Sequence, residues 1–267
     1  MSYIEQPDFA EKRKYIDDFF EMLRPFDRDA SAWRTLEVGG EGGILAGLMA
    51  GHVAHLISTD IVNPQFAYQG EMVSLLKKKF QRNVENLPLD KLEFFTADAQ
   101  HLPFRDDWFD FCFSQNAFEH IPDPEKALRE AVRVTRPGGL IYLMFDPLWT
   151  ADSGSHFLHF IGEPWAQLIE SDGEIAQRMS DAGASEVEID SYRTHMNRRT
   201  IAYYREMFTR VTEELGVKIL IRHEWSGCID PSFVDHPNLA AAAAASGLPT
   251  DDLLVRGLRF LLEVKRT

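Results

Sequence analysis

Cysteine and basic residues are both scarce in this chain of 267 residues, and each scarcity excludes a class of function. The two cysteines, Cys112 and Cys228, are too few to form a zinc cluster by themselves and do not suggest a disulfide framework. Lys and Arg total 28 against 42 Asp and Glu, which gives a formal net charge of −14. Nucleic-acid and anionic-membrane surfaces work by concentrating Lys and Arg, so we expect no nucleic-acid partner.

Long apolar runs are also absent. The longest lies around residues 43–51, far short of the roughly 20 residues that span a bilayer. The first 15 residues are charged throughout and lack the apolar core of a signal peptide. These features predict a cytoplasmic protein without membrane insertion.

Two nucleotide-binding motifs are missing as well. No Gly-Lys-Ser/Thr sequence marks a phosphate-binding loop. Starting from Gly40 and Gly42, the third glycine of a dinucleotide fingerprint is replaced by Leu45. The glycine-rich stretch therefore fits neither pattern, which counts against a dinucleotide or nucleotide-sugar enzyme.

Strands and helices alternate through the first half of the chain. An amphipathic helix over 9–24 stops at Pro25, and Asp123-Pro124-Glu125 is a typical helix start. Further helices are expected at 43–51 and 72–80, and strands at 33–38, 53–59, 92–96, 109–113 and 140–145. This order predicts a mostly parallel α/β sheet with helices on both faces.

The alternation breaks down between Asp146 and about Leu215, where aromatic residues, His and Arg are frequent. We expect this stretch to be an insertion over the strand ends, followed by two late strands at 217–222 and 258–264 that return to the sheet. The predicted division has four segments. An N-terminal helical cap covers 1–33 and a ligand-binding core covers 34–146. An insertion or lid that shapes an acceptor pocket covers 147–214, and C-terminal strands that complete the sheet cover 215–267.

Acidic residues stand at or just after the ends of three successive strands. Glu37 precedes a glycine turn, Asp60 ends the second strand, and Asp98 follows the third. Ligands of open α/β sheets bind beyond the carboxyl ends of the strands, where glycine lets the backbone approach closely. A carboxylate there can accept hydrogen bonds from ribose hydroxyls or an adenine amino group.

Four motifs then carry a resemblance, namely Ala97-Asp98-Ala99-Gln100-His101-Leu102-Pro103-Phe104, Phe109-Asp110-Phe111, Ala117-Phe118-Glu119-His120-Ile121 and Arg136-Pro137-Gly138-Gly139. Together they resemble the core of class I methyltransferases that depend on S-adenosylmethionine (SAM). The resemblance covers residues 34–146 and favours the branch of ubiquinone-biosynthesis, natural-product and polysaccharide enzymes. It implies SAM as cofactor and a Rossmann-like sheet of seven strands, with a lid insertion after the fifth.

The resemblance also implies roles for individual residues. The methionine end of SAM would lie against Glu37, Gly39 and Gly40, the ribose against Asp60 and Ile61, and the adenine against Asp98 and Ala99. Ser114 or Gln115 would offer a main-chain carbonyl to the SAM amino group. Asn116 and His120 would face the reaction centre. The family commonly has glycine where this chain has Glu41, a side chain that would alter the loop.

The catalytic candidates are two histidines. His120 would act as a base near the acceptor or would simply orient its loop. His156 and His159, three residues apart, would share one face of a helix. With no third ligand identifiable, we expect no metal and assign His156 to substrate contact, base catalysis or packing. Asn197, Arg198 and Arg199 would either bind an anionic acceptor or form a solvated face.

The sequence therefore predicts SAM-dependent transfer of a methyl group to a small molecule or glycan precursor. The alternative is a non-catalytic partner or regulatory protein with a SAM fold, which Glu41 in the glycine loop favours. The identity of the acceptor and the oligomeric state do not follow from these residues.

Overall fold

The computed structural model describes residues 9–40, 42–62, 70–82 and 88–265. The chain divides into two compact units, each built from separate stretches of sequence. Unit 1 comprises residues 1–115, 126–142 and 263–267, and unit 2 comprises residues 116–125 and 143–262. The four segments predicted from the sequence stay a prediction.

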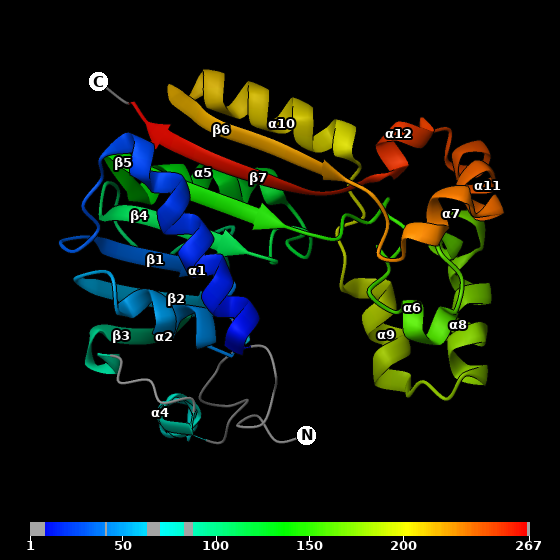
Figure 1. Cartoon of the computed structure of the whole chain (residues 1–267), viewed down its shortest axis with the longest axis horizontal. Coiled ribbons are helices and arrows are strands. Elements are labelled where there is room, and N and C mark those ends of the chain that lie inside the picture. The colour runs from blue at the N-terminus through cyan, green and yellow to red at the C-terminus, as the bar shows by residue number, and fades with distance from the viewer. Residues whose placement is uncertain (1–8, 41, 63–69, 83–87, 266–267) are drawn as a thin grey trace. The chain divides into compact units, whose positions relative to one another are not determined.

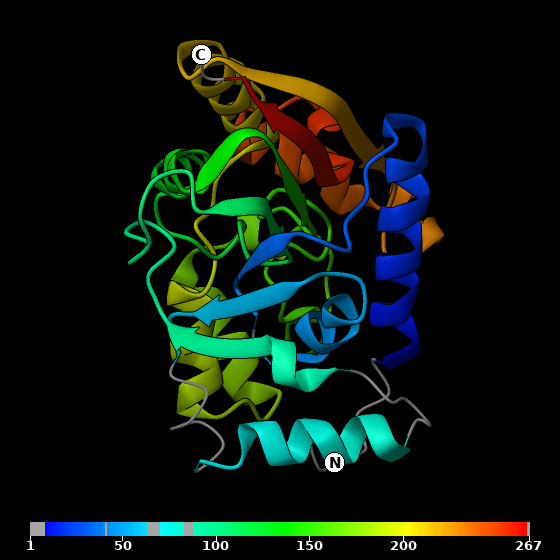
Figure 2. The ribbon, with the colours of Figure 1, turned by 90° about the vertical axis from the view of Figure 1, so that its left-hand side faces the viewer.

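Four strands of unit 1 form a parallel array. They are β1 (Arg34–Val38), β2 (His55–Asp60), β3 (Leu92–Thr96) and β4 (Phe109–Gln115). Leu36 pairs with Ile57 of β2 on one side and with Cys112 of β4 on the other. Figure 2 shows β1, β2 and β3 side by side. The strands lie within a few residues of their predicted positions.

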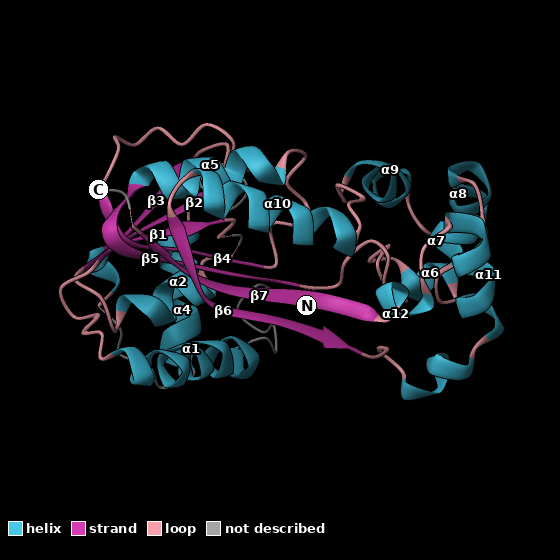
Figure 3. Ribbon diagram, turned by 90° about the horizontal axis from the view of Figure 1, so that it is seen from above, coloured by secondary structure: helices cyan, strands magenta, loops and turns pink. Residues whose placement is uncertain are grey.

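Helices cover both faces of this array, as predicted. They are α1 (Phe9–Leu23), α2 (Ile44–Ala50), α4 (Met72–Arg82) and α5 (Pro124–Val134), the last belonging to unit 1 from Lys126 onward. Figure 3 shows α1, α2 and α4 on one face and α5 on the other. Gly47 is required on α2, because a Cβ there would lie 2.3 Å from the ring of Phe80.

The complete sheet has seven strands in the order β3-β2-β1-β4-β5-β7-β6. The last three strands are β5 (Thr135–Phe145), β6 (Val217–Ser226) and β7 (Val255–Val264). The predicted two late strands are present, but β7 runs antiparallel to β5 and β6 (Figure 1), so the sheet is mixed and the prediction of a mostly parallel sheet was wrong.

The connection between β6 and β7 explains this direction. Gly227, just after β6, donates its N–H to the carbonyl of Leu254, just before β7, at 2.9 Å. The chain therefore re-enters the sheet at the end where it left, after η4 (Pro231–Asp235), α11 (Pro237–Ser246) and α12 (Thr250–Leu253). Strand direction depends on where a connection ends, which local sequence does not encode.

The predicted insertion folds as helices, and the first four of these share a core of their own. The helices are α6 (Leu158–Ile161), α7 (Ala166–Ile169), α8 (Asp172–Asp181), α9 (Glu186–Thr194) and α10 (Ile201–Glu214). Ser171 and Ser185 each begin a helix with a capping box, closed by a glutamate three residues later. Trp149, Met179 and Tyr192 are buried together in the core that α6 to α9 share, whereas α10 packs against β6. Of the helices that the structure describes, none is both long and apolar enough to cross a membrane.

Candidate active site

The turn after β1 holds a buried carboxylate. Glu37 is 2% exposed and accepts a hydrogen bond from the hydroxyl of Ser58 on β2. The N–H groups of Gly39 and Gly40 donate to the carbonyl of Thr59 at 2.8 and 3.0 Å. Gly39 has φ of 79°, a left-handed conformation that glycine adopts without strain. The predicted glycine turn is thus tied to β2, while Glu41 lies outside the described residues.

Gly40 has no room for a side chain. A Cβ there would lie 1.9 Å from the Ser58 hydroxyl oxygen and 2.5 Å from Oε2 of Glu37. The glycine is needed because the Ser58–Glu37 pair fills the space beside it. This close approach gives a physical reason for the glycine in the predicted cofactor loop.

Asp60 and Asp98 stand where the next two strands end. Asp60 is the last residue of β2, and its Oδ1 accepts from the N–H of Val62 at 2.9 Å. Beside it, Ile61 is 68% exposed, which leaves an apolar side chain available to pack against a ligand. Burial acts to raise the pKa of Asp98, but hydrogen bonds from Gln100 and the nearby His101 outweigh it and hold that pKa below the usual value.

The end of β4 carries buried polar atoms that lack partners. Ser114 donates its hydroxyl to the carbonyl of Val38 at 2.8 Å and so ties β4 to β1. Among the described residues, neither Nε2 of Gln115 nor Oδ1 of Asn116 has a hydrogen-bond partner, although both atoms are buried. Asn116 is also held at φ 51°, an uncommon conformation for a residue with a side chain. Such groups are costly unless a ligand or water satisfies them.

These features fit the polar groups of SAM. Glu37, Asp60 and Asp98 offer carboxylate acceptors, Gly40 offers backbone without a side chain, and Gln115 offers an unsatisfied amide. Ala99 lies directly after Asp98 in the chain. The residues therefore suit a ligand with hydroxyl, amino and apolar parts.

Three histidines of unit 2 lie together. His120 follows β4, His156 precedes α6, and His195 ends α9. The ring centroids are 3.9 Å apart for His120 and His195, 5.0 Å for His120 and His156, and 5.6 Å for His156 and His195. The structure thus unites the two predicted catalytic histidines and adds a third, His195, that no local pattern indicated.

The electrostatics of this cluster keep two of its rings, those of His120 and His156, neutral. Burial, reinforced by His195 and His156, lowers the pKa of His120 to about 3. Burial and His195 lower the pKa of His156 to about 4. Both imidazoles are therefore uncharged at neutral pH, and each keeps one nitrogen lone pair.

The predicted pairing of His156 with His159 was wrong. His156 lies before α6 with φ of 64°, whereas His159 lies within that helix and is exposed. The two residues therefore do not share one helix face. The i, i+3 spacing failed because the helix begins at Leu158, after the first histidine.

Asn197 and Arg198 make internal contacts in unit 2. The Asn197 amide donates to the carbonyls of Phe118 and Ile121 at 2.8 and 2.9 Å, which fixes the turn that carries His120. Arg198 pairs with Asp172 and lies over Trp149. These contacts favour a structural role for both over binding of an anionic acceptor.

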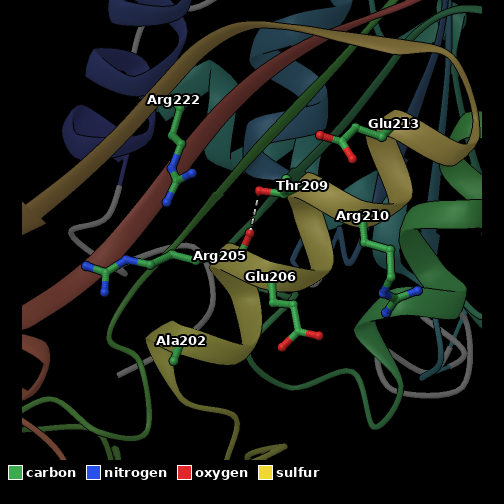
Figure 4. Close-up of a pocket in the computed structure, with 7 residues that line it drawn as sticks. All are labelled: Ala202, Arg205, Glu206, Thr209, Arg210, Glu213 and Arg222. Carbon is green, nitrogen blue, oxygen red and sulfur yellow. Dashed lines mark hydrogen bonds between the residues drawn. The ribbon is translucent and has the colours of Figure 1, made fainter.

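Two hollows lie within unit 2. One, of about 460 Å³, is lined by His156 and its neighbours Pro147, Ser153, Leu158, His159, Ile229 and Arg256. The other, of about 500 Å³, lies along α10 (Figure 4). Its arginines are already paired with carboxylates: Arg205 with Glu224 and Asp252, Arg210 with Glu125, and Arg222 with Glu224. The first hollow is therefore the better candidate for a ligand.

Comparison with known proteins identifies the core. Residues 36–143 match the family model described as a methyltransferase domain. This segment is a class I SAM-dependent methyltransferase domain. SAM is accordingly the cofactor that the domain family uses, and the fit of Glu37, Asp60 and Asp98 agrees with it.

Curated relatives of this methyltransferase domain carry the same general description. An uncharacterized methyltransferase of Mycobacterium avium (strain 104) is 30% identical over 157 residues, covering 57% of this chain and 55% of the relative. Another, of Mycobacterium tuberculosis (strain ATCC 25618 / H37Rv), is 40% identical over 72 residues, which is 26% of this chain and 28% of the relative. The matched segments thus cover 55% of the length of one relative and 28% of the other, so this chain spans about half the length of its relatives at best.

Solved structures support the fold alone. The YcgJ protein of Bacillus subtilis has a TM-score of 0.53 at 16% identity and covers 94% of this chain and 99% of its own. A SAM-dependent methyltransferase of Mesorhizobium loti has a TM-score of 0.51 at 15% identity, and the match covers 91% of this chain and 96% of that protein's chain. The cyclase SpnF also has a TM-score of 0.53 at 16% identity, and the match covers 94% of this chain and 81% of the SpnF chain. The fold of the methyltransferase domain thus also occurs in a protein named for a different activity.

Proposed function

We propose that this protein transfers the methyl group of SAM to a small molecule or glycan precursor. The observation that carries the proposal is the succession of Glu37, Asp60 and Asp98 at or just after the ends of β1, β2 and β3, within a segment that matches a methyltransferase domain. Three carboxylates beside a glycine turn suit one extended cofactor with amino, ribose and adenine groups.

In this proposal each predicted residue has a defined task. The methionine end binds at Glu37 and the turn of Gly39 and Gly40, the ribose at Asp60 and Ile61, the adenine at Asp98 and Ala99, and the amino group near Ser114, Gln115 and Asn116. The partnerless Oδ1 of Asn116 supports this placement, because it can accept a hydrogen bond from the amino group, while the partnerless Nε2 of Gln115 would donate to an oxygen of the ligand.

Bound SAM supplies an activated methyl group whose bond to sulfur breaks as the acceptor atom attacks. The chain's own residues must align the acceptor and exclude water. His120 and His156 are proposed on the acceptor side, since His120 comes soon after β4 and His156 lines a hollow. Their low pKa values make them weak bases, so orientation of the acceptor suits them better than removal of a proton.

The acceptor class rests on the region after β5. Within residues 147–214, the short helices α6 to α9 pack around a buried core of their own, and this compact fold favours a lid that encloses a small acceptor. Arg198, Arg205 and Arg210 each pair with a carboxylate, and the net charge is −14. These features disfavour a nucleic-acid substrate, because phosphate binding needs available cations.

A non-catalytic partner or regulatory protein is the second candidate. Its support is Glu41 in the glycine loop, where the family commonly has glycine. The SpnF cyclase, which shares the fold, is a further reason to measure chemistry rather than assume it.

Calorimetry with SAM and with S-adenosylhomocysteine tests the proposal directly. We expect one site per chain for both ligands, and no thermal stabilisation by NAD or NADP. Absence of binding by either SAM compound would overturn the enzyme assignment. If both bind, release of S-adenosylhomocysteine with a panel of small hydroxyl, amine and glycan acceptors separates a methyltransferase from a regulatory binder, which would turn over none of them.

A further inference from the structure

The cluster of His120, His156 and His195 has the composition of a metal site. Each histidine offers one ring nitrogen, and these three atoms all lie within 4.8 Å of one another. The residues come from three separate parts of the sequence, yet all belong to unit 2. Imidazole nitrogen is a preferred ligand of zinc and related divalent metals.

Hydrogen bonds settle which nitrogen of two rings is available. Nδ1 of His120 lies 3.1 Å from the main-chain oxygen of His195, and a carbonyl only accepts, so Nδ1 carries the proton. The ring of His156 donates to the carbonyl of Pro147. Because Nε2 of His156 has no partner among the described residues, Nδ1 makes that bond. In both rings Nε2 is left with its lone pair.

This arrangement is the one found around metal-bound histidines. Such a ligand usually donates its second ring N–H to a main-chain carbonyl or carboxylate, which fixes the tautomer and the ring direction. His156 is further held at φ 64°, a conformation that costs energy for a residue with a side chain. A buried, partnerless lone pair on a strained residue is costly in the fold and is satisfied by a cation.

We propose that His120, His156 and His195 bind a divalent transition-metal ion, with zinc as the best match. At a zinc–nitrogen distance of about 2.0–2.1 Å, the nitrogens of a tetrahedral site are roughly 3.3 Å apart. The rings must therefore draw together by about 1.5 Å at most, within reach of side-chain rotation because His195 is exposed. Three protein ligands leave the fourth position for water or an acceptor oxygen.

The surroundings suit a cation. Oε1 of Glu119, which is 1% exposed, lies 3.7 Å from Nε2 of His120 and places a carboxyl oxygen beside the site. His195 caps the carboxyl end of α9, where the helix dipole favours positive charge. His156 also lines a hollow together with Arg256, so one of the three ligands borders a space that could hold a small molecule.

The first test uses wild-type protein. A chelator first removes any bound metal, and the chelator is then removed before the titration. Titration with Co²⁺ alone should produce visible absorption bands of a four-coordinate nitrogen site that saturate at one ion per chain. Zn²⁺ should abolish these bands at one equivalent, while excess Mg²⁺ should not, since imidazole suits zinc and not magnesium. A titration without bands or stoichiometric binding would overturn the proposal, and this result does not depend on any variant folding.

Three variants and a matched control provide the second test. His120→Ala, His156→Ala and His195→Ala should each lower the Zn²⁺ affinity by at least about 100-fold. His159→Ala removes the exposed neighbouring histidine and should leave affinity unchanged. Circular dichroism and melting without metal verify folding, and Zn²⁺ should raise the melting temperature of wild type and His159→Ala only. Equal affinity in all four variants would contradict the site.

Metal binding is independent of the proposed methyl transfer. Failure of SAM binding with intact cobalt bands would reject the methyltransferase assignment and keep the metal site. SAM binding without cobalt bands would do the reverse.

Discussion

The Nδ1 atom of His120 lies 3.1 Å from the main-chain oxygen of His195, and this bond joins the loop after β4 to the end of α9. The two residues are 75 positions apart in the chain. The bond assigns the proton of His120 to Nδ1 and presents Nε2 as a lone pair. A contact of the main chain thereby decides what chemistry the side chain can perform.

Glu37 is expected to dominate recognition of SAM. Replacing Glu37 by Gln keeps the shape of the side chain but removes the charge that would hold the methionine end of SAM. Losing one charge-assisted hydrogen bond costs roughly 1.5–3 kcal/mol, so SAM affinity measured by calorimetry should fall roughly 10- to 100-fold. Glu93→Gln, on the exposed part of β3, is the matched control and should bind normally. Equal affinities of the two variants would refute the role of Glu37.

Asn197 is expected to be a major stabiliser of unit 2. Its side-chain amide donates to Phe118, Ile121 and the hydroxyl of Tyr204. Asn197→Ala leaves these partly buried acceptors unsatisfied and should lower the free energy of unfolding by about 2–4 kcal/mol in urea denaturation. Gln177→Ala, which removes an exposed amide paired with Asp181, should change it by less than about 0.5 kcal/mol. If Asn197→Ala lowers the free energy of unfolding as little as the control does, the hydrogen bonds of Asn197 contribute little to stability.

Glu224 should make stability depend on pH. Its pKa lies below the usual 4.5, chiefly because Arg205 donates hydrogen bonds to it, while burial opposes this and Arg222 assists. A lowered folded-state pKa means that the unfolded chain binds the proton more readily. The stabilisation that the Glu224 carboxylate gives the fold is therefore complete above the pKa of the unfolded chain. It is lost as pH falls through the lower pKa of the folded protein.

Urea denaturation between pH 7 and pH 3 measures this contribution. The free energy of unfolding of wild type should exceed that of Glu224→Gln by about 1 kcal/mol at pH 7, and this difference should vanish as pH falls below the folded-state pKa of Glu224. Glu213→Gln changes an exposed glutamate of α10 and should follow wild type throughout. Parallel curves for wild type and Glu224→Gln would mean that the ion pairs of Glu224 add nothing.

The two cysteines should differ sharply in reactivity. Cys112 is fully buried in β4, and burial raises its pKa to about 12, whereas Cys228 is partly exposed with a pKa that burial raises less. The thiolate is the reactive form, so Ellman's reagent at pH 8 should label one thiol slowly in the native protein and two after denaturation. Cys228→Ser should abolish native labelling. Rapid labelling of both thiols would contradict the placement of β4 in the core.

The sequence by itself determined the elements of unit 1 and the cofactor loop. The strand Phe109–Gln115 is recognisable because its burial demands apolar residues, and every residue from Phe109 to Phe113 except Asp110 is apolar. Glu37, Asp60 and Asp98 were likewise predictable, since the carboxyl ends of parallel strands gather at one edge of a sheet whatever the loops do. These features depend on residues close together in the chain.

Only the tertiary structure decided the direction of β7 and the grouping of the histidines. The antiparallel course of β7 follows from the meeting of Gly227 with Leu254, and no periodicity within the strand reports it. His195 joins His120 and His156 because Asn197 fastens its segment to the turn after β4. The i, i+3 spacing predicted His159 as the neighbour of His156, whereas the fold places His195 beside it, because packing brings side chains together regardless of their spacing in sequence.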